Sequence, residues 1–454
     1  MREMKDSGVE WLGKIPNHWM IRRIKNLFEL RNEKNYEALE DVNLISLYTD
    51  KGVVQHSDLT ETTGNKAVTA EGYKIVKEDD IVVNIILCWM GAVGRSAYNG
   101  VTSPAYDVYK PLHDTNSKYY HYLFRTSQFN GECYRYGRGI MLMRWRTYST
   151  EFRAISVPLP PEDEQKRIVN FLDKKIDDVD RLIGNVQKQI EKLKAYKQSL
   201  ITEVVTKGID PTVPMKDSGV EWIGEIPEHW NIERLKFNVS INAEKQSSLD
   251  LPYIALEHIE GFSGKRIKTD NVYEVDGAIV AHSGEILFGK LRPYLAKVYK
   301  VEEETYVSSE FAVFSAETID NQYLKWYMLS YGFLDTVNAS TYGTKMPRAN
   351  IDFIKNMYIP VFDVQEQEKI ALYLNEKSSK IDQLIAIKQS KIEKLEQYKR
   401  SLIYEYMVAL EAATYILVSG VKLASHADSS SGMLTDVIMC TYELIEKCAK
   451  EIEK

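Results

Sequence analysis

The feature that most constrains the fold is a segment that occurs twice. Residues 4–19 have the sequence MKDSGVEWLGKIPNHW, and residues 215–230 have MKDSGVEWIGEIPEHW, so the copies differ only at Leu12/Ile223, Lys14/Glu225 and Asn17/Glu228. The two copies are offset by 215 − 4 = 211 residues. A repeat of this length indicates two copies of one structural unit. The chain is therefore predicted to fold as two related modules.

A second repeat follows each copy of this opening segment. Glu164-Gln165 and Glu366-Gln367 begin two long helical patterns that match at an offset of 366 − 164 = 202 residues. Between opener and helix lie two divergent stretches, the second shorter by 211 − 202 = 9 residues. We predict the following segments: a first module at 1–158, a long helix at 159–206, a linker at 207–214, a second module at 215–360, a second long helix at 361–406, and a tail of unknown role at 407–454.

The divergent stretches predict mixed α/β modules. Short runs rich in β-branched and aromatic residues, such as 44–48 and 81–87, are typical of strands. Residues 118–129 and 322–334 have the apolar spacing of a helix. The two modules share an architecture but differ in their residues, as expected of recognition modules with different targets. Two diverged copies of a purely structural domain would give the same pattern. The fold class is α+β with an internal pseudo-twofold repeat.

Apolar residues in both long helices recur every seven positions, which predicts an antiparallel coiled coil. About 40 residues at 1.5 Å rise give each helix a length of roughly 60 Å. Two amphipathic helices that pack on separate cores are the alternative. The predicted seam, which is also a candidate partner-binding surface, consists of Ile176, Val179, Ile183, Val186, Ile190, Leu193 and Leu200 in the first helix and Ile381, Ile385, Ile392, Leu395 and Leu402 in the second.

Composition and motifs argue against several classes of protein. The net charge of −7 argues against a surface that is basic throughout, so any nucleic-acid interface must be local. The four cysteines show no zinc-ligand spacing, and no apolar run is long enough to span a membrane. The familiar metal-hydrolase, nucleophile-elbow and dinucleotide-binding motifs do not occur. We therefore expect a cytoplasmic non-enzyme without catalytic residues, metal or cofactor of its own.

Clusters of basic and aromatic residues precede both long helices at matching positions. Arg146 and Arg348 differ by 348 − 146 = 202 residues, the offset of the helices themselves. Guanidinium groups suit contacts with phosphate and bidentate contacts with guanine, although exposed basic loops are common in proteins of every class. The candidate DNA-binding residues are Arg135, Tyr136, Arg138, Arg144 and Arg146 in the first module, and Lys290, Arg292, Tyr342, Thr344, Lys345 and Arg348 in the second.

The repeated motifs resemble the specificity (S) subunit of type I restriction-modification systems. The resemblance rests on the GVEW-L/I-G-x-IP-x-HW opener, the Glu-Gln helix start and the Ser-Leu-Ile sequences at 199–201 and 401–403. It covers about residues 4–406, and the tail departs from the family pattern. A coiled-coil scaffold that joins two protein-binding modules without DNA remains the alternative.

The resemblance implies two target-recognition domains, each recognising one half of a split double-stranded DNA sequence, and a helical spacer between them. It further implies two methyltransferase (M) subunits as partners, docked mainly on the long helices, and two restriction (R) subunits. S-adenosylmethionine, ATP and Mg would then be bound by these partners.

Overall fold

The computed structural model describes residues 3–58, 69–112, 115–141, 144–246, 251–267, 278–343 and 345–407. They belong to two compact units. Unit 1 comprises Met1–Leu182 and Lys394–Lys454, and unit 2 comprises Ile183–Glu393. Of the predicted tail, only Met407 is among the described residues. Each unit thus contains one module together with part of both long helices.

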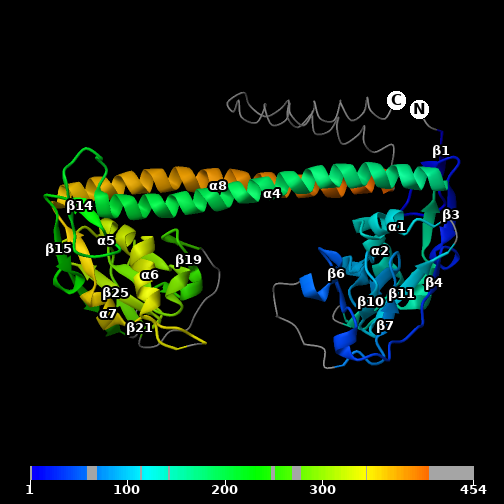
Figure 1. The fold of residues 1–454 in the computed structure, drawn as a ribbon, viewed down its shortest axis with the longest axis horizontal. Helices are drawn as coiled ribbons and strands as arrows, with labels where there is room; N and C mark the ends of the chain where they lie inside the picture. The colour runs from blue at the N-terminus through cyan, green and yellow to red at the C-terminus, as the bar shows by residue number, and fades with distance from the viewer. Residues whose placement is uncertain are drawn as a thin grey trace. The chain divides into compact units, whose positions relative to one another are not determined.

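Unit 1 is built on a four-stranded antiparallel sheet with the order β4-β11-β8-β9. Its strands are β4 (Phe28–Leu30), β11 (Tyr106–Pro111), β8 (Ile81–Asn84) and β9 (Val93–Arg95). The helices α1 (Ser117–Phe124), α2 (Ser127–Tyr136) and α3 (Ser149–Ala154) follow the sheet (Figure 1). Further strand pairs are β5 (Ile45–Tyr48) with β6 (Gly52–Gln55), β7 (Lys74–Val76) with β10 (Gly100–Thr102), and β3 (Met20–Arg23) with β12 (Ser156–Leu159).

Unit 2 repeats this sheet as β16-β25-β22-β23. Its strands are β16 (Val239–Asn242), β25 (Phe311–Ala316), β22 (Ile286–Gly289) and β23 (Val298–Lys300). The helices are α5 (Asn321–Met328), α6 (Tyr331–Ala339) and α7 (Ile351–Asn356), and β15 (Asn231–Arg234) pairs with β26 (Tyr358–Val361). A further sheet has the order β17 (Lys245–Gln246), β21 (Ala278–Ala281), β24 (Thr305–Val307) and β18 (Tyr253–Ile254).

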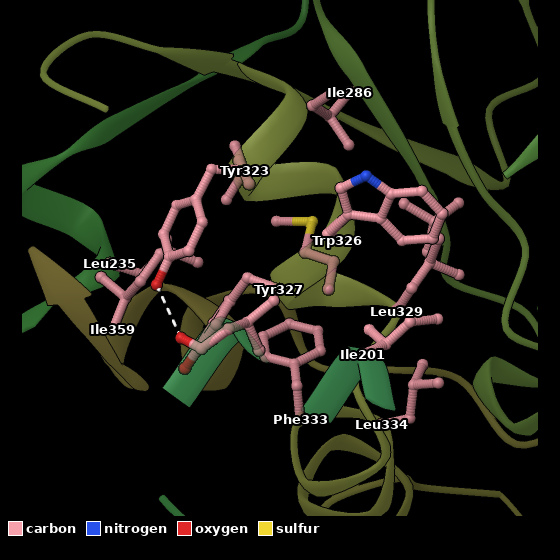
Figure 2. Packing of buried hydrophobic residues seen from close by; sticks show 14 of the residues in the cluster. Ile201, Leu235, Ile286, Tyr323, Trp326, Tyr327, Leu329, Phe333, Leu334 and Ile359 are labelled. Carbon is pink, nitrogen blue, oxygen red and sulfur yellow. Dashed lines mark hydrogen bonds between the residues drawn. The ribbon is translucent and has the colours of Figure 1, made fainter. Parts of the chain in front are cut away.

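Aromatic side chains from the module and aliphatic side chains from a long helix share one core in unit 2. Figure 2 shows Tyr323, Tyr327 and Phe333 in one cluster with Ile201. The ring centroids of Tyr327 and Phe333 are 5.3 Å apart. Because this cluster is buried, the long helix forms part of the module's core as well as pairing with the other helix.

The two helices predicted at 118–129 and 322–334 are each interrupted, so the prediction of single helices is wrong. In unit 1, Thr126 separates α1 from α2 because its hydroxyl donates to the Leu123 carbonyl and accepts from the Phe129 amide. In unit 2, the Ser330 hydroxyl donates to the Tyr327 carbonyl between α5 and α6. Such side-chain bonds offer the backbone an alternative to the helical ladder.

The repeated opener has the same structure in both units. Strands β1 (Met4–Asp6) and β2 (Lys14–Pro16) pair in the register Met4 with Pro16, and β13 (Met215–Asp217) and β14 (Glu225–Pro227) pair Met215 with Pro227. The turns between them place Gly8 and Gly219 at φ of 68° and 71°, a region that glycine enters without strain. Nearly identical sequences therefore give the same strand pairing.

Each opener is attached to the start of a long helix through the repeated glutamate. In unit 1, Glu164 Oε2 lies 2.7 Å from His18 Nε2 and accepts from Trp19 Nε1 at 3.0 Å. In unit 2, Glu366 pairs with His229 at 2.9 Å and with Trp230 at 3.2 Å. The two segments that repeat in the sequence, the opener and the start of the long helix, therefore contact each other in both units.

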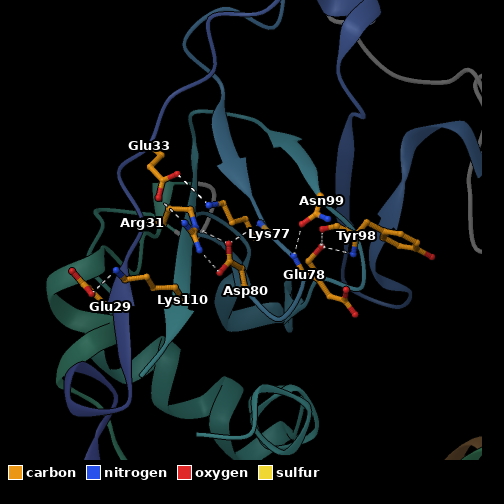
Figure 3. A network of polar contacts seen from close by, with 10 residues as sticks. Glu29, Arg31, Glu33, Lys77, Glu78, Asp80, Tyr98, Asn99 and Lys110 are labelled. Atoms are coloured by element: carbon orange, nitrogen blue, oxygen red, sulfur yellow. Dashed lines mark hydrogen bonds and ion pairs between the residues drawn. The ribbon is translucent and has the colours of Figure 1, made fainter. Parts of the chain in front are cut away.

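A buried carboxylate lies just before β8 in unit 1 and just before β22 in unit 2. These strands are the third in the order of each sheet and are called the central strands below. In unit 1, Asp80 accepts from Arg31 Nε at 2.7 Å, and this contact raises the pKa of Arg31 (Figure 3). In unit 2, Glu285 takes the place of Asp80 and accepts from Asn242 Nδ2 at 3.0 Å. The contact is retained although an ion pair in one module becomes an amide–carboxylate hydrogen bond in the other.

The long helices are α4 (Glu162–Lys207) and α8 (Val364–Met407), of 46 and 44 residues (Figure 1). Within unit 1, the Phe171 and Tyr406 rings are 4.5 Å apart, and Lys399 Nζ lies 2.7 Å from Asp180. Within unit 2, Lys197 Nζ lies 2.7 Å from Asp382. In each unit, residues early in one helix contact residues late in the other, which confirms the antiparallel pairing.

The residues predicted to form the seam are all buried or half-buried. Ile176, Val179, Val186, Ile190, Leu200, Ile381, Ile392 and Leu402 are buried, and Ile183, Leu193, Ile385 and Leu395 are half-buried. A cluster of Val186, Ile190 and Ile392 lies entirely between the two helices of unit 2. The fold class predicted from the sequence is confirmed. Within the described ranges, no helix has the length and apolar character needed to cross a membrane.

Candidate nucleic-acid interface

The predicted contact residues of unit 1 gather where the central strand β8 ends. After β8 the chain makes a short turn, η4 (Cys88–Met90), that packs on α2. Trp89 lies 5.8 Å from Tyr134, and Tyr134 stacks on Trp145 at 4.8 Å. These three rings connect the turn to the segment that follows α2.

That segment, the 138–146 loop, is described at residues 138–141 and 144–146. Arg138 and Arg146 bond to each other through their backbones at 2.8 and 2.9 Å. A Cβ on Gly137 would lie 2.3 Å from Trp145 Nε1, and one on Gly139 would lie 2.6 Å from the Arg144 carbonyl. Gly139 therefore has no room for a side chain, because the backbone of the opposite arm lies too close, whereas a side chain at Gly137 would have to displace the Trp145 indole.

The guanidinium groups of this loop differ in their surroundings. Arg135 donates to Glu132 at 2.6 Å, which raises its pKa, and lies 5.2 Å from the Tyr136 ring. Arg138 lies 2.7 Å from Glu151, whereas Arg146 donates to the Trp145 carbonyl at 3.2 Å. Among the described residues, nothing accepts a hydrogen bond from the exposed Arg144 side chain. The structure thus places Arg138, Arg144 and Arg146 on one loop, and Arg135 and Tyr136 at the end of α2 just before it.

Unit 2 builds the same arrangement from different residues. The segment 342–348, here the 342–348 loop, closes through backbone bonds between Tyr342 and Arg348. It lies against the segment after β22, where Ala349 donates to the Lys290 carbonyl at 2.9 Å and Arg292 donates to the Pro347 carbonyl at 2.8 Å. In unit 1, Thr147 makes the corresponding bond to the Ile85 carbonyl.

Arg348 differs from the other predicted cations of unit 2. Its Nη2 and Nε donate to the two oxygens of Glu310 at 2.6 and 3.2 Å, and this contact lowers the pKa of the Glu310 carboxyl. Arg348 therefore holds the loop in place. Lys345, Arg292 and Tyr342 are exposed and Lys290 is half-buried. Thr344 lies outside the described residues.

Sequence reasoning missed several exposed apolar side chains in this region. Leu87 and Met90 are 37% and 50% exposed on the turn, and Ile140 is 92% exposed on the 138–146 loop. In unit 2, Leu295 is also exposed, at 38%. A pattern of cations does not mark these side chains, and the 205-residue offset that aligns the two turns is set by strands β8 and β22 of the structure.

Each module is attached to its long helix at an equivalent place. In unit 1, Asp173 of α4 accepts from the Tyr122 hydroxyl and from Lys118, both at 2.6 Å. In unit 2, Asn375 of α8 accepts from Trp326 Nε1 at 3.1 Å. The offsets 375 − 173 = 202 and 326 − 122 = 204 match those of the repeated elements. These contacts hold each module against the part of the long helix that belongs to the same unit.

Comparison with known proteins agrees with this repeated geometry. The family model described as type I restriction modification DNA specificity domain matches the chain twice, at residues 16–192 and 223–397. The chain belongs to this family. It is a specificity subunit with two recognition domains, which supports the DNA-recognition interpretation over the protein scaffold.

Relatives of the chain carry consistent names. The type I restriction enzyme MjaVIII specificity subunit of Methanocaldococcus jannaschii is 25% identical over 86% of this chain and 92% of its own length. The EcoDI specificity subunit of Escherichia coli is 26% identical over 48% of this chain and 53% of its own. A chain from a solved structure on complex assembly in the type I restriction-modification system has a TM-score of 0.62 at 14% identity, covering 87% of this chain and 98% of that one. The last likeness concerns the fold.

Proposed function

We propose that this specificity subunit recognises a split double-stranded DNA target, with the 138–146 loop and the turn after β8 contacting one half-site. The 342–348 loop and the turn after β22 contact the other. The observation that carries the proposal is that both units place exposed cations at one position, after the central strand and before the long helix. A local basic site on a chain of net charge −7 suits a subunit that binds DNA within a larger complex.

The proposal assigns unequal roles to the cations. Arg144, Lys345 and Arg292 are exposed and suit contacts with phosphate or with guanine. Arg138 and Arg348 are paired with Glu151 and Glu310, so they shape the loops. A DNA phosphate or base would have to compete with Glu151 for Arg138, or with Glu310 for Arg348.

The remaining functions are assigned to partners. The chain performs no reaction, takes up two methyltransferase and two restriction subunits, and works in the cytoplasm. S-adenosylmethionine, ATP and Mg²⁺ bind to those subunits. In support, the chain lacks the familiar cofactor motifs, and α4 and α8 carry exposed apolar side chains such as Leu182 and Leu384 outside their seam. The paired helices act as the spacer that sets the gap between half-sites.

The test uses the chain together with the methyltransferase subunit of its own system and a random DNA library. We expect methylation only at a split consensus sequence. Arg144→Ala should relax one half of that consensus and leave the other half unchanged. Arg22→Ala is the matched control, because Arg22 is also exposed and, within the described part of the chain, donates to atoms of its neighbours Ile21 and Met20.

Uniform methylation of the library would contradict sequence recognition by this subunit. Loss of both halves in Arg144→Ala would show that this residue supports folding or assembly and does not contact one half-site.

A further inference from the structure

The turn after the central strand is the same element in both units but differs in chemistry at its cap residue. Strands β8 and β22 begin 286 − 81 = 205 residues apart, and the turns η4 (Cys88–Met90) and η8 (Pro293–Leu295) begin 293 − 88 = 205 residues apart. The residue that caps each turn is Leu87 in unit 1 and Arg292 in unit 2, again 292 − 87 = 205 apart. An aliphatic side chain thus replaces a guanidinium.

The turn of unit 1 is apolar on its exposed side. Leu87 and Met90 are 37% and 50% exposed, and no residue of 87–90 carries a charge. In unit 2, Arg292 and Tyr294 are exposed, together with Leu295 at 38%, so the two turns differ mainly at the cap residue. The backbone at Arg292 is left-handed, with φ of 51°, whereas Leu87 has φ of −113°, so each turn orients its cap residue separately.

Both turns lie beside the basic loops described above. The aromatic contacts from Trp89 through Tyr134 to Trp145 connect the unit 1 turn to the 138–146 loop. The Arg292 amide bonds directly to the 342–348 loop. An apolar turn next to exposed arginines is therefore placed to meet a surface that combines phosphates with apolar groups.

The major groove of DNA offers only one exposed apolar group, the C5-methyl of thymine, while guanine offers two acceptors that match a guanidinium. We propose that Leu87 and Met90 contact thymine methyl groups in the half-site recognised by unit 1, and that Arg292 contacts guanine in the half-site recognised by unit 2. This inference rests on the proposed function and adds the chemical class of base that each turn selects.

The experiment removes single methyl groups from the DNA. Each thymine of the two half-sites is replaced in turn by deoxyuridine, which keeps base pairing, and affinity for the complex with the methyltransferase subunit is measured by competition. Burying one methyl group corresponds to about a fourfold change in affinity. We expect this loss at one or more thymines of the unit 1 half-site.

Protein variants assign the effect to the turn. In Leu87→Ala/Met90→Ala, the deoxyuridine substitution should no longer weaken binding, while recognition of the other half-site continues and shows that the complex is intact. Met20→Ala is the control, since Met20 is 48% exposed on β3, much as Met90 is on the turn. It should keep the full sensitivity to deoxyuridine.

The outcomes separate the two hypotheses. Specific binding that is indifferent to every deoxyuridine, or a sensitivity that survives in the double variant, overturns the thymine assignment and leaves the proposed function intact. Absence of any sequence-specific binding by the unaltered complex overturns the proposed function itself.

Discussion

Gly137→Ala should displace the 138–146 loop without disturbing the rest of unit 1. Gly137 has φ of −72°, which alanine adopts easily, so the backbone itself adds no strain. The new Cβ would lie 2.3 Å from Trp145 Nε1 and 2.8 Å from its Cδ1. The indole must move away by about 1 Å to reach ordinary van der Waals distance.

Moving Trp145 weakens two contacts. Its Nε1 donates to the Tyr134 carbonyl at 3.0 Å, and its ring stacks on Tyr134. A net hydrogen bond and an aromatic pair contribute about 0.5–1.5 kcal/mol each. The local cost is therefore about 1–3 kcal/mol, which corresponds to a loss of about 5- to 150-fold in affinity for one half-site.

The assay compares DNA fragments in which one half-site at a time is scrambled. Gly137→Ala should lose discrimination at the unit 1 half-site and keep it at the other. Gly131→Ala is the matched control in the same helix, because a Cβ there meets no atom within 4 Å. It should stabilise α2 by about 0.5–1 kcal/mol and leave recognition unchanged. Equal recognition by both variants would refute the role of Trp145 in positioning the loop.

Three further outcomes are expected. Asp80→Asn should lower the free energy of unfolding by about 3 kcal/mol, because it removes the carboxylate that pairs with Arg31 Nε and leaves Glu33 to neutralise this buried guanidinium. Lys110→Ala, which removes an exposed ion pair, should cost under about 1 kcal/mol, and urea titration measures both variants. Burial lowers the pKa of Lys325 to about 8, so its charging opposes folding fully below pH 8 and not above about pH 10.5. Lys325→Met should therefore stabilise unit 2 by about 1–3 kcal/mol at pH 7, with the gain disappearing above pH 10.5; the opposite pH trend would contradict this sign. Inserting one heptad into both α4 and α8 should widen the gap between half-sites by about three base pairs, since seven residues add about 10 Å. An unchanged gap would show that these helices are not the spacer.

The repeat and the heptad pattern sufficed to predict the duplicated architecture and the antiparallel helices. The domain boundaries and the individual contact residues stay predictions. Local patterns carried this information because the two nearly identical openers fold alike, and because a seven-residue apolar period specifies helix pairing whatever lies between the helices. The same reasoning failed at Thr126 and Ser330, where one hydroxyl ends a helix inside a continuous apolar pattern.

Only the tertiary structure decided which residues of the candidate interface are exposed and which are held. From sequence alone, Arg144 and Arg348 are both candidate DNA contacts, yet Arg348 donates its Nε and Nη2 to the two oxygens of Glu310 while Arg144 is exposed. Likewise, nothing local connects His18 with Glu164, 164 − 18 = 146 residues away, or aligns Leu87 with Arg292. Pairings across such distances follow from how strands and helices pack, and packing is a property of the whole unit.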